Sequence, residues 1–274
     1  MAQQDLDKIE ELPTLPRFVQ DILKVVNDKD APLPDVAAAL AMDPGTSGRV
    51  VSAANAAFFT GYQPIYSVDD AAVRLGLNRV RVLATTTLLS AQFQSSACPA
   101  FDQGRFWRAS MNVALCASKL GNYVPLETET AAGYLAGLLH NVGVLANAYV
   151  FPDAMQRVLT ADDRDETSVA ERELRELGFD HYESGSRLLS TWDLPEPLVA
   201  VVAHHADPDY QGDWGRLTDM VGACVEWYRA GYEDRPTRRI LRGISEPKLN
   251  NIGMSCRRED EQLSTFAEEV AGAA

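Results

Sequence analysis

The hexapeptide LLHNVG, residues 138–143, lies near the middle of the longest apolar run in the sequence, residues 131–151. Only His140, Asn141 and Asn147 bring polar side chains other than tyrosine into that run. A membrane span is disfavoured because His and Asn cost free energy in hydrocarbon when they lack partners. We therefore expect one buried core helix over residues 128–149.

The pair His140-Asn141 is the informative part of this hexapeptide. An adjacent His-Asp pair on a buried helix would supply two metal ligands. The carboxamide of Asn141 carries no negative charge to offset a dication, and it cannot bridge two metals as a carboxylate does. The sequence thus indicates the frame of a metallohydrolase pocket in which one ligand has been changed.

Outward from this run, the apolar pattern is helical almost throughout. Apolar residues recur at spacings of three and four between Leu15 and Val26, and no alternation typical of strands is found. The composition changes near residues 97–99. We predict an all-α fold of two packed helical halves, residues 1–100 and 101–234, followed by a C-terminal helical extension packed on the domain, residues 235–274.

Bulk composition restricts the classes of partner. The 274 residues are 46% hydrophobic and 23% charged, which suits an ordinary globular core. A net charge of −14 disfavours nucleic acid and anionic membranes as partners. The four cysteines form no CxxC pair, and the first residues contain no apolar signal region. We expect a reduced, cytoplasmic protein.

Two basic features allow a second interpretation. The pattern of residues 68–83 indicates two helices joined by a glycine, with Arg74, Arg79 and Arg81, and a DNA-binding helix-turn-helix would show the same pattern. We interpret these residues as a scaffold element whose arginines lie on a solvated face. Residues 235–258 are locally basic. That stretch could bind an acidic partner or a nucleotide, and we favour its neutralising the acidic body.

All four histidines fall in the second half of the chain: His140, His181, His204 and His205. His204 and His205 are adjacent, so their side chains point roughly 100° apart on a helix. We expect at most one of them to face a pocket shared with the others.

The ordered pattern resembles the HD superfamily of metal-dependent phosphohydrolases, and more closely its HDOD branch, the HD-related output domains of bacterial signalling proteins. The resemblance covers about residues 10–230. It is carried by these motifs: LPTLP at 12–16, DP at 43–44, Asn55 with Phe58, AAVRLG at 71–76, FW at 106–107, LLHNVG at 138–143, His181 with WDLP at 192–195, and AHH at 203–205. The first-half motifs distinguish HDOD from ordinary HD enzymes.

The resemblance implies four metal-ligand positions, of which one remains unchanged. The first histidine falls at Ala109, the His-Asp pair becomes His140-Asn141, and the late aspartate falls near Cys224. His181, His204 and His205 match positions that serve a second metal in some HD enzymes. Mg²⁺ or Mn²⁺ would need carboxylate oxygens that these positions lack, and none of them holds a carboxylate to activate water. We expect no catalytic residues, no cofactor and no metal.

Two interpretations of the remaining pocket residues stay open. In the favoured one, His140 is a hydrogen-bonded core residue, and Asn141 caps or bridges helices. In the other, Cys224 and His140 form a rebuilt Zn²⁺ site, with His181 as a further ligand.

The HDOD resemblance implies a non-enzymatic bacterial signal-transduction protein that regulates through protein–protein contacts. Members of the family are often fused to receiver, kinase or cyclic-di-GMP-turnover domains, for which this chain has no room. We therefore expect it to act as a stand-alone adaptor or to receive its signal from a separate protein. One alternative is a metal-dependent phosphohydrolase of nucleotides or cyclic dinucleotides. A second is a pocket that senses a nucleotide without hydrolysing it.

Overall fold

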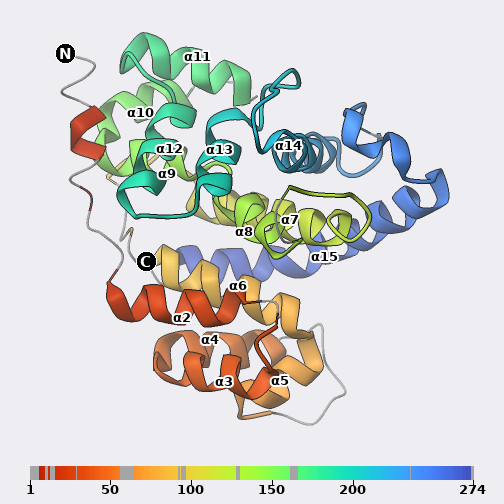
Figure 1. The fold of residues 1–274 in the computed structure, drawn as a ribbon. Coiled ribbons are helices and arrows are strands. Elements are labelled where there is room, and N and C mark those ends of the chain that lie inside the picture. Colours follow the sequence, from red (N-terminus) through yellow and green to blue (C-terminus); the bar gives the residue numbers. More distant parts are fainter. Residues whose placement is uncertain are drawn as a thin grey trace.

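The structure is a computed structural model, and it describes residues 6–9, 12, 16–28, 30–55, 65–91, 93, 97–127, 130–160, 166–234 and 236–272. Within these ranges the chain is helical and contains no strand, so the all-α prediction is confirmed. Figure 1 shows two groups of helices, one above the other, with the last helix running between them.

The lower group in Figure 1 comes from the first part of the chain. Its helices are α2 (Arg17–Asn27), α3 (Leu33–Ala41), α4 (Pro44–Asn55), α5 (Val68–Leu75) and α6 (Leu77–Ser90). Gly76, at φ +84°, joins α5 to α6 and confirms the predicted helix–glycine–helix. Glycine suits this position because other residues rarely adopt a positive φ.

The upper group follows. Its helices are α7 (Gln103–Leu120), α8 (Thr130–Leu139), α9 (Val142–Val150), α10 (Pro152–Leu159), α11 (Glu166–Glu176), α12 (His181–Thr191), α13 (Glu196–His204) and α14 (Gly215–Arg229). A short 3₁₀ helix, η2 (Arg239–Gly243), then leads into α15 (Glu246–Gly272). None of the helices within the described ranges is long and apolar enough to cross a membrane.

The single helix expected over residues 128–149 is two helices, so that prediction was wrong. α8 ends at Leu139 and α9 begins at Val142. Asn141 stands at the start of α9 with φ −115° and ψ 18°, outside the helical range. Nδ1 of His140 hydrogen-bonds the carbonyl of Gly137 at 2.7 Å, an acceptor that a continuing helix would use for a backbone N–H. The two polar residues thus mark the break.

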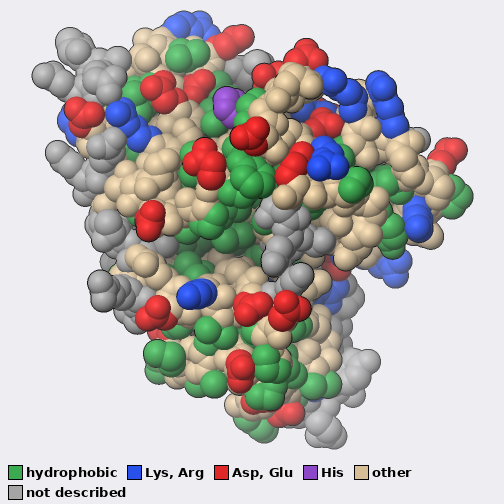
Figure 2. Space-filling model, in the orientation of Figure 1, with side chains coloured by type: hydrophobic (Ala, Val, Ile, Leu, Met, Phe, Trp, Pro, Cys, Tyr) green, Lys and Arg blue, Asp and Glu red, His purple; other side chains and the backbone are tan. Residues whose placement is uncertain are grey.

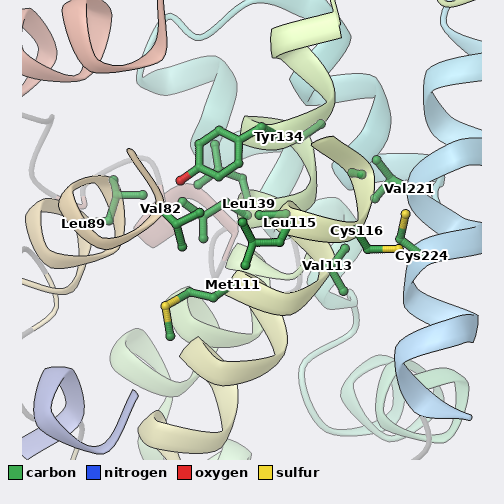
Figure 3. Close-up of a cluster of buried hydrophobic side chains, with 14 of the residues drawn as sticks. Val82, Leu89, Met111, Val113, Leu115, Cys116, Tyr134, Leu139, Val221 and Cys224 are labelled. Atoms are coloured by element: carbon green, nitrogen blue, oxygen red, sulfur yellow. The ribbon is translucent and has the colours of Figure 1, made fainter. Parts of the chain in front are cut away.

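One hydrophobic core runs through both groups of helices. Figure 3 shows where they meet: Val82 and Leu89 of α6 point toward Met111 and Leu115 of α7, with Leu139 of α8 beside them. A smaller buried cluster lies under α9, α10 and α11 and includes Met155 and Val158. Contact between α6 and α7 therefore joins the halves through apolar packing.

The arginines around Gly76 do not form a solvated face, so that interpretation was wrong. Arg74 donates to the carbonyl of Ala54 at 3.1 Å and to Oδ1 of Asn55 at 3.3 Å. Arg81 donates to the carbonyl of Asp28 at 2.6 Å, and Arg79 pairs with Glu259 at 3.4 Å. Arg74 and Arg81 bond carbonyl groups near helix ends, which lack helical partners, while Arg79 pairs with a carboxylate of α15. All three guanidinium groups tie separate segments together.

α15 is held across both groups by two consecutive acidic residues. Glu259 accepts from Lys119 of α7 at 2.7 Å and also pairs with Arg79 of α6. Asp260 receives two hydrogen bonds from Arg108, at 2.7 and 2.8 Å, and one from Asn112 at 2.8 Å. The paired bonds from one guanidinium fix direction as well as distance. The last helix is therefore anchored to both groups.

Candidate functional site

The upper group contains a buried row of aromatic rings contributed by three helices. The ring of His140, just after α8, meets that of His205, just after α13, edge to face with centroids 5.2 Å apart. His205 in turn lies 5.4 Å from Tyr182 of α12, whose ring is 4.1 Å from that of His181. The fold thus brings together three of the four histidines that the sequence singled out.

The hydrogen bonds of His140 and His205 define where their protons lie. Nδ1 of His140 bonds the carbonyl of Gly137, and Nδ1 of His205 bonds the carbonyl of Val201 at 3.0 Å. A carbonyl oxygen only accepts, so each Nδ1 is the donor and the neutral ring carries its proton there. Metal-binding histidines commonly use this arrangement, which gives Nε2 the acceptor role.

His181 is engaged by a buried carboxylate that the sequence did not single out. Oε2 of Glu173 accepts from the backbone N–H of His181 at 2.8 Å and lies 2.5 Å from its Nδ1. Oε1 of the same group accepts from Asn147 at 3.1 Å. Glu173 and His181 are both fully buried. Glu173 lies among charged residues of α11 that are mostly exposed, so no local pattern distinguishes it from its neighbours.

Close contact between α9 and α12 positions this carboxylate and His181. A Cβ at Gly143 would lie only 1.8 Å from the carbonyl oxygen of His181, and one at Gly185 would lie 2.9 Å from the nitrogen of Gly143. Only glycine permits two helix backbones to approach so closely. The glycine of the LLHNVG stretch is therefore required by the packing against α12.

His204 and Asn141 differ from the other predicted pocket residues. His204 is half-buried and stacks on Tyr210, with centroids 4.2 Å apart and planes 12° apart, while its neighbour His205 is buried among the other rings. Asn141 is the N-cap residue that precedes α9, but its side chain makes no capping hydrogen bond, and its Oδ1 has no hydrogen-bond partner among the described residues.

Cys224 does not lie with the histidines. Its thiol interacts with that of Cys116 of α7, which also interacts with that of Cys256 of α15. Figure 3 shows the side chains of Cys116 and Cys224 pointing toward each other. On α14 the residue that meets His205 is Gly222, where an added Cβ would be 2.3 Å from the His205 carbonyl. Cys224 is two residues further, about 200° around the helix. The proposed zinc pair of His140 and Cys224 is therefore not brought together.

Thiol contacts and burial both raise the pKa values of Cys116 and Cys256. The hydrogen bond with Cys224 is the main cause that raises the pKa of Cys116 well above its ordinary value, and burial adds to it. The pKa of Cys256 is raised in the same way, chiefly by Cys116. Both thiols stay protonated at neutral pH, the form that neither binds metals nor attacks disulfides readily.

Arg238 closes the site from the α14 side. It donates to the carbonyl of His205 at 3.0 Å and to Glu226 at 2.6 Å, and it lies 3.5 Å from Asp219. Its side chain is only 5% exposed. A buried guanidinium thus offsets part of the charge of the two carboxylates that α14 presents on the same face as Gly222.

The donor set does not fit the metal centre of an HD enzyme. The first-ligand position carries the methyl group of Ala109, and Asn141 is a carboxamide. Glu173, the carboxylate bonded to a pocket histidine, is already engaged by His181 and Asn147. Across the described ranges, no group of three or more His, Cys, Asp or Glu side chains is arranged to hold a metal. Hard divalent cations in proteins are held chiefly by carboxylate oxygens, which Ala109, Asn141 and Cys224 do not supply.

The HDOD domain model matches residues 12–208, more than half of the chain. The chain belongs to the HDOD family. An uncharacterised protein of Treponema pallidum (strain Nichols) is 23% identical over 247 residues, which are 89% of this chain and 47% of that protein. The chain therefore spans about half the length of this curated relative.

Solved structures show the same HDOD fold. An HDOD domain protein of unknown function from Geobacter sulfurreducens has a TM-score of 0.75 at 24% identity, covering 98% of this chain and 96% of that one. A protein of Marinobacter aquaeolei VT8 named for signal transduction has a TM-score of 0.76 at 23% identity, covering 96% of this chain and 60% of that one. At these identities the likeness concerns the fold.

Proposed function

We propose that this HDOD protein is a regulatory module of bacterial signalling that acts in the cytoplasm through contacts with a partner protein and does not hydrolyse phosphoesters. The observation that carries this proposal is the donor set around His140. The other HD ligand positions hold Ala109, Asn141 and Cys224, and Cys224 is turned toward Cys116. None of these three positions supplies a carboxylate, and Glu173 is already engaged by His181 and Asn147, which argues against both a hard-metal site and a free base to activate water.

Elemental analysis combined with a hydrolase assay tests the catalytic half of the proposal. Untagged protein purified without chelator is expected to contain no stoichiometric metal. It should show no turnover of phosphomonoesters, nucleotides or cyclic dinucleotides with Mg²⁺ or Mn²⁺ added. Stoichiometric zinc that disappears in His140→Ala but persists in His204→Ala would contradict it, because His140 lies against the ring of His205 whereas His204 stacks on Tyr210.

Thermal-shift measurements separate regulation through partners from nucleotide sensing. A ligand that binds only the folded state raises the melting temperature, by an amount set by its concentration relative to Kd. We expect nucleotides and cyclic dinucleotides to leave the melting temperature unchanged. A shift that is abolished by His205→Ala would favour the sensing pocket instead.

Crosslinking in cells tests the partner half of the proposal. A reproducible crosslinked partner is expected, and deletion of the protein should change the output of the pathway to which that partner belongs. Recovery of no partner, together with unchanged cell behaviour on deletion, would contradict a role in regulation by contact.

A further inference from the structure

The charge of this protein is unevenly distributed along the chain. Residues 229–258 contain eight Lys or Arg residues against three Asp or Glu, a net charge of +5. The remainder therefore carries −19, so that the whole chain is at −14. The family match ends at residue 208, so this basic region lies outside the matched domain.

The folded chain gathers these cations at one end. Figure 2 shows Lys and Arg side chains concentrated at the upper right, over the end where Figure 1 places the turn after α14 and the start of α15. Six basic side chains of this region are exposed and are called the basic end here: Arg229, Arg239, Arg242, Lys248, Arg257 and Arg258.

The ion pairs of Arg239 and Arg257 neutralise these two side chains only weakly. Arg239 pairs with Asp209, and Arg257 with Glu233, but the two carboxylates are 90% and 74% exposed. Such exposed pairs contribute little and exchange readily with other partners. Among the described side chains, no ion pair engages Arg242 or Arg258. The interpretation that this stretch serves to neutralise the acidic body therefore does not account for them.

An apolar side chain stands within the basic end. The outer face of α15 carries Asn250, Met254 and Arg258 at spacings of four, while the inner face carries the buried Leu249, Ile252 and Cys256. Met254 is 56% exposed. Methionine adapts to varied apolar partners, which suits a contact surface. Lys248 at the start of α15 lies 4.5 Å above the half-exposed ring of Tyr123, a second apolar element.

We propose that the basic end is the docking surface for an acidic segment of a partner protein, which places an apolar side chain against Met254. This proposal rests on the proposed regulatory function, of which it names the contact surface. Opposite charge steers association and sets its salt dependence, while the apolar contact adds to the lifetime of the complex. A protein segment fits better than nucleic acid, because a long phosphate backbone would also run over the acidic remainder of the surface.

The test uses the full-length chain and a short synthetic peptide of glutamate and leucine with a fluorescent label. Anisotropy should report saturable binding that weakens as salt is raised. The double variant Arg242→Glu/Arg258→Glu should weaken binding about tenfold, equivalent to about 1.4 kcal/mol. Met254→Asp should weaken it at every salt concentration. Arg175→Glu, which reverses an exposed arginine on α11, is the matched control and should bind as the unmodified protein does.

Each other outcome overturns the inference. Binding that is absent, or equal in all variants, rules out the basic end as a docking surface. An RNA oligonucleotide that binds as tightly, with the same loss in the double variant, would make the surface a general polyanion site. If the protein self-associates and the double variant does not, the basic end binds a second copy of this chain and not a partner protein. In any of these cases, a partner that crosslinks equally well to the double variant would still support the proposed regulatory function. That function would be contradicted only if no crosslinked partner were found.

Discussion

At the scale of single residues, Gly143 is the position where adding one side-chain carbon should lower the free energy of unfolding most. A Cβ there would lie 1.8 Å from the carbonyl oxygen of His181, and both belong to helix backbones that cannot move independently. Gly143→Ala should destabilise the protein by about 3 kcal/mol, measured by urea unfolding. Gly48 in α4, where an added Cβ meets nothing within 4 Å, is the matched control. Gly48→Ala should stabilise slightly because alanine has the higher helix propensity.

Glu127 illustrates a residue whose charge supports a helix end. Its carboxylate accepts from the backbone N–H groups of Arg216 and Leu217, at 2.8 and 3.2 Å, at the start of α14. Burial alone would raise its pKa, but the hydrogen bonds from Arg216 and Leu217 more than offset this, so the pKa is lowered from 4.5. Glu127→Gln should cost about 1 kcal/mol at neutral pH.

The lowered pKa of Glu127 determines how that cost varies with pH. A carboxyl whose folded-state pKa is depressed contributes its full stability above the unfolded pKa and loses it as pH falls through the folded pKa. The melting temperatures of the unmodified protein and Glu127→Gln should therefore differ at pH 7 and converge below the ordinary carboxyl range. A difference that persists unchanged in acid would show that the charge of Glu127 is not what supports α14.

At the scale of elements, sequence patterns predicted where helices lie better than where they break. Apolar residues at spacings of three and four predicted the location of most helices, because a helix that buries one apolar face requires that spacing. The break between α8 and α9 was missed, since His140 and Asn141 could equally occupy the interior of a helix. Nor could Glu173 be found, because its burial depends on α11 packing against α12, a contact between segments that a single helical period does not encode.

The side chain of Glu173 joins three helices by hydrogen bonds, and we expect their packing to depend on it. It accepts from the backbone of His181, at the start of α12, and from Asn147 of α9, while itself lying on α11. Glu173→Ala leaves these buried donors without their acceptor, which should cost about 3 kcal/mol or more. Hydrogen exchange should show α11 opening first. Glu171→Ala, an exposed change on the same helix, should be neutral; equal effects of the two changes would contradict the role assigned to Glu173.

At the scale of the molecule, the family motifs predicted the overall fold but not the composition of its pocket. The motifs put His140 in a pocket with at most one of the adjacent His204 and His205, and the structure places His205 beside His140. The match to the late aspartate of HD enzymes also placed Cys224 in this pocket. A matched position in the sequence does not reveal which face of α14 the side chain occupies. The thiol contacts turn that face toward α7 and α15, and Gly222 meets His205 instead.

The thiol contacts also provide a probe of how α15 holds the two groups of helices together. Cys116 and Cys256 are buried where α15 lies on α7, and their raised pKa values keep both thiols protonated. A thiol reagent should therefore label them slowly, through opening of α15. The variant Glu259→Ala/Asp260→Ala removes the contacts with Arg79, Lys119 and Arg108, so this labelling should accelerate about tenfold.

Cys98 supplies the internal control for that measurement. It is buried in the separate cluster beside α10, where its thiol contacts Gln156, and the residues given for that cluster come from outside α15. Because opening of α15 does not expose it, Cys98 should label at the same rate in both proteins, as mass spectrometry of the labelled peptides can resolve. Parallel acceleration at Cys98 would indicate global unfolding. Unchanged rates at Cys116 and Cys256 would show that apolar packing, and not the two acidic residues, holds α15 across the molecule.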